Sequence, residues 1–236
     1  DHTAVDFLES LEVPAYKIAS FENTDINLIK KVIATKKPII ISTGMASLSD
    51  LELIVTTFRS NGCENFVLLK CTSAYPATPA DANLQTISHM ARMFNCQVGL
   101  SDHTMGIGVS LAAIALGATV IEKHFCLSRA EGGVDSAFSL EPHELKNLVI
   151  ESERAWQALG SVQYGSLSDQ EKKSMQFKRS IYFVKDMKAG EVITQDSIRC
   201  VRPGYGLEPK YFENLLGRLV KNPVRKGDAV AWSCLE

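Results

Sequence analysis

The sequence lacks the features that mark several classes of protein. No apolar run approaches the ~20 residues that a transmembrane helix needs, and the N-terminus, DHTAVDFLES, is acidic and amphipathic, unlike a signal peptide. The formal net charge is only -2, which argues against a broad surface for nucleic acid or for an anionic membrane. We therefore expect neither nucleic acid nor a membrane as a partner. A local basic pocket for a small anion remains compatible with this charge.

Closely spaced cysteine pairs are also absent. The six cysteines show no CxxC spacing and are scattered along the chain: Cys63, Cys71, Cys96, Cys126, Cys200 and Cys234. In a chain of 236 residues this pattern is typical of reduced thiols in a cytoplasmic protein. No internal repeat or low-complexity tract is visible, and the hydrophobic content of 45% is ample for a core.

Strand-like and helix-like segments alternate five times along the first two thirds of the chain. The strand-like segments are 15–20, 38–43, 66–72, 97–104 and 119–126, and their starts lie 22 to 31 residues apart. The helix-like segments are 3–12, 26–36, 48–62, 84–94, 107–117 and 142–159, with Ser47 or Ser49 as the N-cap of the third. This rhythm predicts a parallel α/β fold.

Polar residues stand where each of these strands ends. A (β/α)8 TIM barrel has its active site along that rim, whereas an open, doubly wound sheet binds ligands at one switch point. Five consecutive polar strand ends favour the barrel. Because a barrel needs eight strands and only the C-terminal five β/α units are visible, we expect the sequence to be part of a longer protein.

The pattern of apolar and polar residues changes after Gly160, and we predict that the chain has three parts. Residues 1–160 form the partial barrel. Residues 161–177 are polar, lack helical or strand periodicity, and are expected to form a linker. Residues 178–236 contain short strand-like segments and the tight turns KAGE and RKGD, so they are expected to form a small, mostly β module.

Two histidines end consecutive strand-like segments. His103 follows the fourth and His124 the fifth, with Asp102, Glu122 and Asp135 nearby. Two neutral imidazoles beside carboxylates suit a divalent metal ion. A single histidine at a strand end is more often structural, but two at equivalent positions favour a metal site.

A lysine and several serines accompany the histidines at the strand ends. Lys17 lies inside an apolar strand, where an unpaired ammonium is costly, so it either binds an anion at the rim or pairs with Glu22. Four serines follow strand ends as well: Ser20, Ser42, Ser73 and Ser101. Each alone is as easily a helix cap, but together with Lys17 they would form a cradle for one phosphate.

Six motifs in this order resemble the sialic acid synthase family. They are YKIASFE (16–22), IIISTGM (39–45), LLKCTSAYP (68–76), GLSDHT (99–104), IEKHF (121–125) and RPGYG (202–206). These enzymes condense phosphoenolpyruvate with an N-acetylated amino sugar to a nine-carbon 2-keto acid. The stretches RAEGGVDSAFSLEP, ERAWQALG and RPGYGL are most similar to the pseudaminic acid synthase branch, which uses a diacetamido-trideoxy-hexose. The resemblance covers essentially the whole chain.

The resemblance implies a fold, a metal and a set of site residues. The fold is a TIM barrel followed by an antifreeze-like (SAF) domain. A divalent metal, manganese in this family, would be held by His103 and His124. The phosphate of phosphoenolpyruvate would be bound by Lys17, Ser20, Ser42 and Ser101, with Ser73 at a position where neuraminate synthases carry asparagine.

The same resemblance assigns the sugar side of the site. Tyr75, Glu122 and Asp135 match sugar-site positions, and Glu22 completes the expected substrate-binding residues. His103, His124, Glu122 and Asp135 would be the catalytic residues. Arg202 would reach across into the partner's barrel, which implies a domain-swapped homodimer. The family also uses a glutamate and a lysine on early strands, a segment that this sequence does not contain.

Other interpretations remain open at this point. The chain resembles N-acetylneuraminate and legionaminate synthases as well. Another phosphoenolpyruvate-condensing barrel, such as a 3-deoxy-sugar-acid synthase, would lack the module at 178–236. With three strands missing, the chain is alternatively an inactive fragment that serves as a binding or assembly module.

Overall fold

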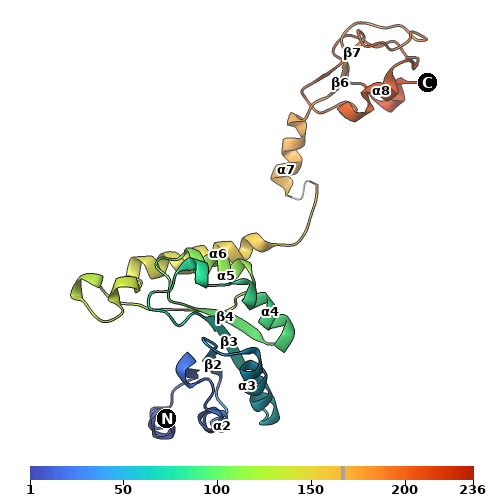
Figure 1. Ribbon diagram of the computed structural model, residues 1–236. Coiled ribbons are helices and arrows are strands. Elements are labelled where there is room, and N and C mark those ends of the chain that lie inside the picture. Colours follow the sequence, from blue (N-terminus) through green and yellow to red (C-terminus); the bar gives the residue numbers. More distant parts are fainter. Residues whose placement is uncertain (166–167) are drawn as a thin grey trace. The chain divides into compact units, whose positions relative to one another are not determined.

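The protein folds into two compact units, residues 1–160 and residues 161–236. The computed structural model describes residues 1–165 and 168–236, and Figure 1 follows the chain through both units. Residues 166 and 167, which belong to the expected linker, lie outside the described residues. No described helix is both long and apolar enough to cross a membrane. All six cysteines are free thiols.

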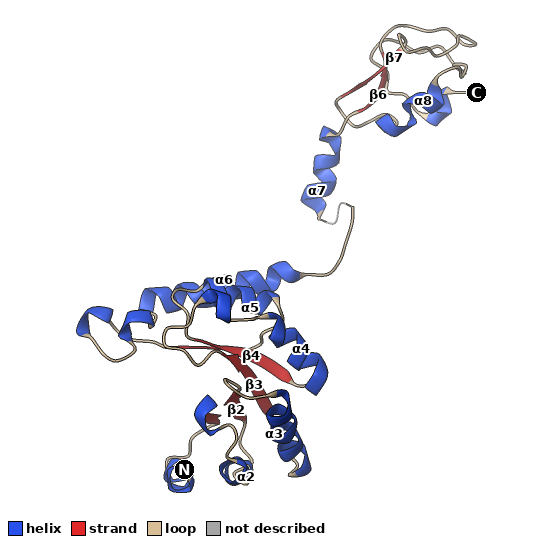
Figure 2. Ribbon diagram, viewed as in Figure 1, coloured by secondary structure: helices blue, strands red, loops and turns tan. Residues whose placement is uncertain are grey.

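The first unit is built on five parallel strands. They are β1 (Tyr16–Ile18), β2 (Ile39–Ser42), β3 (Phe66–Cys71), β4 (Gln97–Asp102) and β5 (Ile121–Lys123). Their order in the sheet is their order in the chain. A doubly wound sheet reverses its strand order at the switch point, so this order excludes that alternative. The strands form a half-barrel (Figure 2), which confirms the parallel fold predicted from the rhythm and the barrel favoured by the polar strand ends.

Helices alternate with the strands along the chain, and the first helix precedes β1. They are α1 (His2–Ser10), α2 (Ile26–Ile33), α3 (Leu48–Ser60), α4 (Gln85–Phe94), α5 (Gly108–Ala115) and α6 (Pro142–Leu159). Consecutive helices contact each other, α1 with α2, α2 with α3 and α5 with α6. Right-handed crossovers between neighbouring strands bring each helix back to the same side of the sheet. The helices therefore cover one face of the sheet. The carboxyl ends of the strands lie together at one edge and form the rim.

Local sequence accounts for the helix boundaries. Ser47, one of the two expected caps, begins α3: its hydroxyl accepts from the backbone N–H of Asp50, whose carboxylate accepts from the N–H of Ser47. Ser49 lies inside the helix. At the far end of the unit, Pro142 opens α6 and Gly160, with φ +48°, follows its last residue.

The apolar strands and helices bury one continuous core. Ile41 and Leu68 in the sheet and Ile29, Phe58 and Ile87 on the helices are completely buried. Phe58 of α3 stacks on Phe66 of β3 with ring centroids 4.6 Å apart. This packing holds the strands in register, and with them the residues at the strand ends.

The second unit begins with a helix that the sequence reasoning missed. The segment expected to be a linker contains α7 (Asp169–Ser174), followed by a 3-10 turn, Met175–Phe177. The hydroxyl of Ser168 accepts from the backbone N–H of Glu171 and caps α7. The helix is polar on all sides, so no periodicity of apolar residues reveals it. The spacing of Ser168 and Glu171, typical of a helix start, was the available signal.

The rest of this unit has fewer strands than expected. Among the residues that the structure describes here, only β6 (Ser180–Phe183) and β7 (Ile198–Val201) form an antiparallel ladder, and α8 (Phe212–Leu215) is a short helix. The other strand-like segments pair through isolated bridges, such as Met187 with Val224. Turns at Gly190 and Gly227, where φ is +80° and +98°, reverse the chain before longer ladders form. A small apolar core, which includes Ile181, Phe183 and Val230, holds the module together.

Candidate active site

The ends of β4 and β5 bring the two histidines together. Ser101 lies opposite Glu122, and Asp102 opposite Lys123, in the parallel register. His103 and His124 come next on their strands, and their ring centroids are 5.2 Å apart. The ring of Tyr75 lies 4.3 Å from that of His103 and 5.9 Å from that of His124. These three residues, expected at one rim, are neighbours in space.

His103 is buried and held by a backbone carbonyl. Its Nδ1 lies 2.9 Å from the carbonyl oxygen of Thr72, and the thiol of Cys71 lies 3.9 Å from the same nitrogen. Burial acts to lower the pKa of His103, but the bonds to Cys71 and Thr72 outweigh it and the pKa is raised. A ring that donates Nδ1–H to a carbonyl carries its lone pair on Nε2, which is the usual arrangement of a metal-ligating histidine.

His124 has the properties of a neutral ligand. Burial, and then the nearby His103, lower the pKa of its imidazole. Its Nδ1 lies 3.4 Å from a carboxylate oxygen of Asp135. The Nδ1 of His124 thus faces a carboxylate, as the Nδ1 of His103 faces the carbonyl of Thr72. The two imidazoles therefore fit a divalent metal ion, with coordination positions left for substrate and water.

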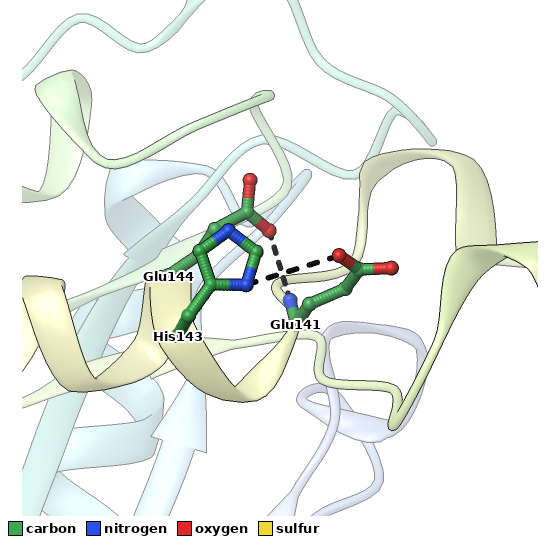
Figure 3. Close-up of side chains that lie close together, drawn as sticks. All are labelled: Glu141, His143 and Glu144. Carbon is green, nitrogen blue, oxygen red and sulfur yellow. Dashed lines mark hydrogen bonds and ion pairs between the residues drawn. The ribbon is translucent and has the colours of Figure 1, made fainter.

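A tighter group of possible ligands lies elsewhere. Glu141, His143 and Glu144, at the start of α6, place potential ligand atoms within 4.8 Å of one another (Figure 3). The carboxylate of Glu144 accepts from the N–H of Glu141 at 2.9 Å and pairs with the guanidinium of Arg129. Glu141 accepts from the backbone N–H of Arg129 at 2.8 Å. Both carboxylates thus have partners without an ion, and we assign the group to the capping of α6.

Lys17 pairs with Glu122 and not with Glu22. Its ammonium lies 3.3 Å from one carboxylate oxygen of Glu122, and the hydroxyl of Ser101 donates to the other at 2.6 Å. The alternative in which Lys17 pairs with Glu22 is therefore wrong. Glu22 ends a 3-10 turn, Ser20–Glu22, that points it into solvent, so it is exposed.

Two serine side chains lie beside Gly44, just after β2, and a third serine, Ser42, ends that strand. The hydroxyl of Ser20 accepts from the backbone N–H of Gly44 at 3.1 Å. A Cβ on Gly44 would lie 2.7 Å from the hydroxyl of Ser20 and closer still to that of Ser73. The buried hydroxyl of Ser42 has no hydrogen-bond partner among the described residues. Buried polar groups are normally paired, so this hydroxyl suits an anion that binds beside it.

Cys71 and Gly44 are two members of this region that the sequence reasoning did not single out. The thiol of Cys71 lies 3.8 Å from the hydroxyl of Ser73 and 3.9 Å from His103. Burial raises its pKa, but hydrogen bonds to His103, Ser20 and Ser73 outweigh burial and lower the pKa to about 7. Its place at the end of β3, like that of the other polar strand ends, was the available signal.

Arg202 belongs to the second unit. It is exposed and directly follows β7. Eleven of the twelve expected site residues lie in the first unit, at strand ends or in the loops that follow them. Glu22 is exposed on a turn, and Arg202 lies in the other unit.

The half-barrel with its polar rim is typical of a (β/α) barrel domain, and the comparisons with known proteins agree on this fold. The model of the NeuB family matches residues 1–164, and that of the SAF domain matches residues 178–236. The chain belongs to the NeuB family.

The similar curated proteins include synthases of pseudaminic acid and of N,N'-diacetyllegionaminic acid. The chain is 42% identical to pseudaminic acid synthase from Campylobacter jejuni over 228 residues, which are 96% of this chain and 66% of that one. It is 36% identical to N,N'-diacetyllegionaminic acid synthase from the same species, over 98% of this chain and 70% of that one. The chain therefore spans about two thirds of the length of these curated relatives.

A solved structure shows the same fold. N-acetylneuraminic acid synthetase from Leptospira borgpetersenii, in complex with citrate, superposes with a TM-score of 0.69 at 35% identity. The match covers 73% of this chain and 60% of that one.

Proposed function

We propose that the chain carries the synthase site of an enzyme that condenses phosphoenolpyruvate with an N-acetylated amino sugar. The product is a nonulosonic acid, and phosphate is released. The observation that carries this proposal is the convergence of the paired imidazoles with the Lys17–Glu122–Ser101 group at one strand-end rim. The higher identity to pseudaminic acid synthase than to legionaminic acid synthase favours a diacetamido-trideoxy-hexose as the sugar.

The residues divide into two halves around the reacting atoms. Lys17 and the hydroxyls of Ser20, Ser42, Ser73 and Ser101 bind the phosphate of phosphoenolpyruvate. Tyr75, Glu122 and Asp135 orient the open-chain sugar, and Glu122 faces both halves because it contacts Lys17 and Ser101. When bound by His103 and His124, a divalent metal, which we take to be manganese, supplies Lewis acidity toward the sugar aldehyde.

The bond changes follow from the two substrates. The enol carbon of phosphoenolpyruvate forms a bond to the aldehyde carbon, and the aldehyde oxygen takes up a proton. Water adds to C2 of the former enol, and phosphate leaves from that carbon with its bridging oxygen. Side chains of this chain hold the two substrates with their reacting carbons close together. Such positioning accounts for much of the rate enhancement in a two-substrate reaction.

We further propose that the enzyme acts as a domain-swapped homodimer. Arg202 of one subunit would then bind the sugar in the barrel of its partner. A planar guanidinium with several fixed donors suits an N-acetyl group.

The decisive test is a product assay with defined sugars. The full chain is incubated with phosphoenolpyruvate, Mn²⁺ and either the diacetamido-trideoxy-hexose of the pseudaminate series, that of the legionaminate series, or N-acetylmannosamine. Phosphate release and the mass of the sugar acid are measured. We expect product with the pseudaminate-series sugar and none after chelation of the metal. Product with only another sugar would overturn the proposed branch, and the absence of product with all three would overturn the proposed activity.

A further inference from the structure

The residues that directly precede the two histidines form a buried ion pair. The ammonium of Lys123 lies 2.9 Å from a carboxylate oxygen of Asp102, and the two side chains are only 3% and 1% exposed. Asp102 and Lys123 are partners in the register of β4 and β5. The pair therefore joins the two strands one residue before His103 and one residue before His124.

The hydrogen bonds of this pair extend to the loop and the helix that follow β4. One oxygen of Asp102 accepts from the backbone N–H and the hydroxyl of Thr104, at 2.8 and 2.7 Å. The other accepts from the hydroxyl of Ser110 on α5 at 2.7 Å, as well as from Lys123. Lys123 also donates to the carbonyl oxygen of Thr104. Both neighbours of His103, Asp102 and Thr104, are thus fixed to Lys123.

The pair lies on the opposite face of the strands from the site. Side chains alternate between the two faces of a strand. Ser101 and Glu122 therefore lie on the same face as His103 and His124, where the hydroxyl of Ser101 donates to Glu122 at 2.6 Å. Asp102 and Lys123 meet on the face covered by α5, which contributes Ser110. The two strands are therefore connected on both faces directly before the histidines.

We propose that Asp102 and Lys123 are positioning residues, which set the separation of His103 and His124 for a shared divalent metal ion. This inference rests on the proposed function insofar as that function assigns the metal to the two histidines. A buried ion pair is often no more stabilising than an apolar pair of similar size. The charged pair adds directed bonds that place the backbone on both sides of His103.

The test separates positioning from stability. The variants Asp102→Asn, Lys123→Met and the double variant are made in the full chain, with Ser110→Ala as a milder change. Mn²⁺ affinity is measured by calorimetry, the absorption spectrum of bound Co²⁺ reports ligand geometry, and urea unfolding reports stability. Loss of a residue that orients a metal ligand typically costs 10- to 100-fold in affinity. We expect losses of about that size in the single variants, a smaller loss in Ser110→Ala, and an altered Co²⁺ spectrum.

The double variant is the decisive one. Replacing both charges often recovers stability, so a structural role predicts that affinity recovers with it, whereas a positioning role predicts that affinity stays low. Ile54→Ala, in the buried core of α3, serves as the control that loses stability and keeps native Mn²⁺ affinity. If Lys123→Met does not fold, Asp102→Asn and Ser110→Ala provide the same comparison.

Two different results would overturn the inference, and they distinguish its failure from the failure of the proposed function. Native affinity and a native Co²⁺ spectrum in the folded variants, while His103→Ala and His124→Ala lose Mn²⁺, would overturn the positioning role alone. Mn²⁺ binding that both histidine variants retain, or that the native chain lacks, would overturn the metal assignment of the proposed function and the inference with it.

Discussion

Lys17 and Glu122 meet at the rim of the half-barrel, with ammonium nitrogen and carboxylate oxygen 3.3 Å apart. Lys17 belongs to β1 and Glu122 to β5, the first and last strands of the sheet order. Because the sheet curves, the ends of its two outer strands face each other across the mouth. Glu122 also accepts from Ser101, so this carboxylate of the expected sugar site contacts two side chains of the expected phosphate site.

Removal of the ammonium at this rim should affect one substrate more than the other. We expect Lys17→Met to weaken the binding of phosphoenolpyruvate by roughly tenfold or more, since hydrogen bonds to charged groups are worth about 1.5–3 kcal/mol. Sugar binding should change less. Steady-state kinetics with each substrate varied in turn measure the two effects. Lys30→Met, at an exposed lysine of α2 outside the expected site, is the matched control. Normal saturation by phosphoenolpyruvate with poor saturation by the sugar would place Lys17 in the sugar half of the site.

The two imidazoles should act as one unit. We expect His103→Ala and His124→Ala each to abolish metal-dependent condensation with little loss of fold. The double variant should be no worse than either single one, because residues that act on one ion are not additive. Calorimetry with Mn²⁺ and activity assays measure these effects. His143→Ala, from the compact group at α6, is the control and should bind metal normally. If His143→Ala alone lost metal binding, the metal site would have to be assigned to the group at the start of α6.

Space beside the serines should be essential for the phosphate. A methyl group on Gly44 would collide with the hydroxyls of Ser20 and Ser73, so we expect Gly44→Ala to raise the KM for phosphoenolpyruvate by about tenfold or more, a loss of ~1.4 kcal/mol or greater if KM follows binding. Gly108→Ala is the control, because a Cβ there meets nothing within 4 Å and alanine favours the helix. Wild-type kinetics in Gly44→Ala would show that the phosphate does not lie beside these hydroxyls.

The role of Arg202 can be separated into action within a subunit and action across subunits. Loss of an exposed arginine without a role costs about 0.5 kcal/mol or less. We expect instead that Arg202→Ala is inactive and that mixing it with inactive His124→Ala restores activity. In a swapped dimer, the mixed pair places both lesions on one composite site and leaves the other intact. Mixed dimers, verified by mass spectrometry, that remain inactive would argue against the swapped arrangement.

Near neighbours in sequence were a poor guide to some partners at the site. Glu22 lies five residues from Lys17, yet the 3-10 turn Ser20–Glu22 leaves it exposed, and Lys17 pairs with a residue on the far strand. Likewise, the partner of His103 is the carbonyl of Thr72, on the loop after the preceding strand. Such pairs depend on how far the sheet curves and on where each loop returns, which a local pattern does not contain.

The parallel half-barrel could be predicted from the sequence, because continuous apolar runs and local caps such as Ser47 with Asp50 specify strands and helices within a few residues, and polar strand ends favour a barrel. The sequence also indicated which residues stand at the strand ends, since parallel strands carry those ends to one edge. The contacts among these residues could not be predicted and became visible in the folded protein: Lys17 with Glu122, His103 with Thr72, and the buried pair of Asp102 and Lys123. These depend on register and curvature across strands far apart in the chain, where the free energy is set by burial and mutual geometry and not by local propensity.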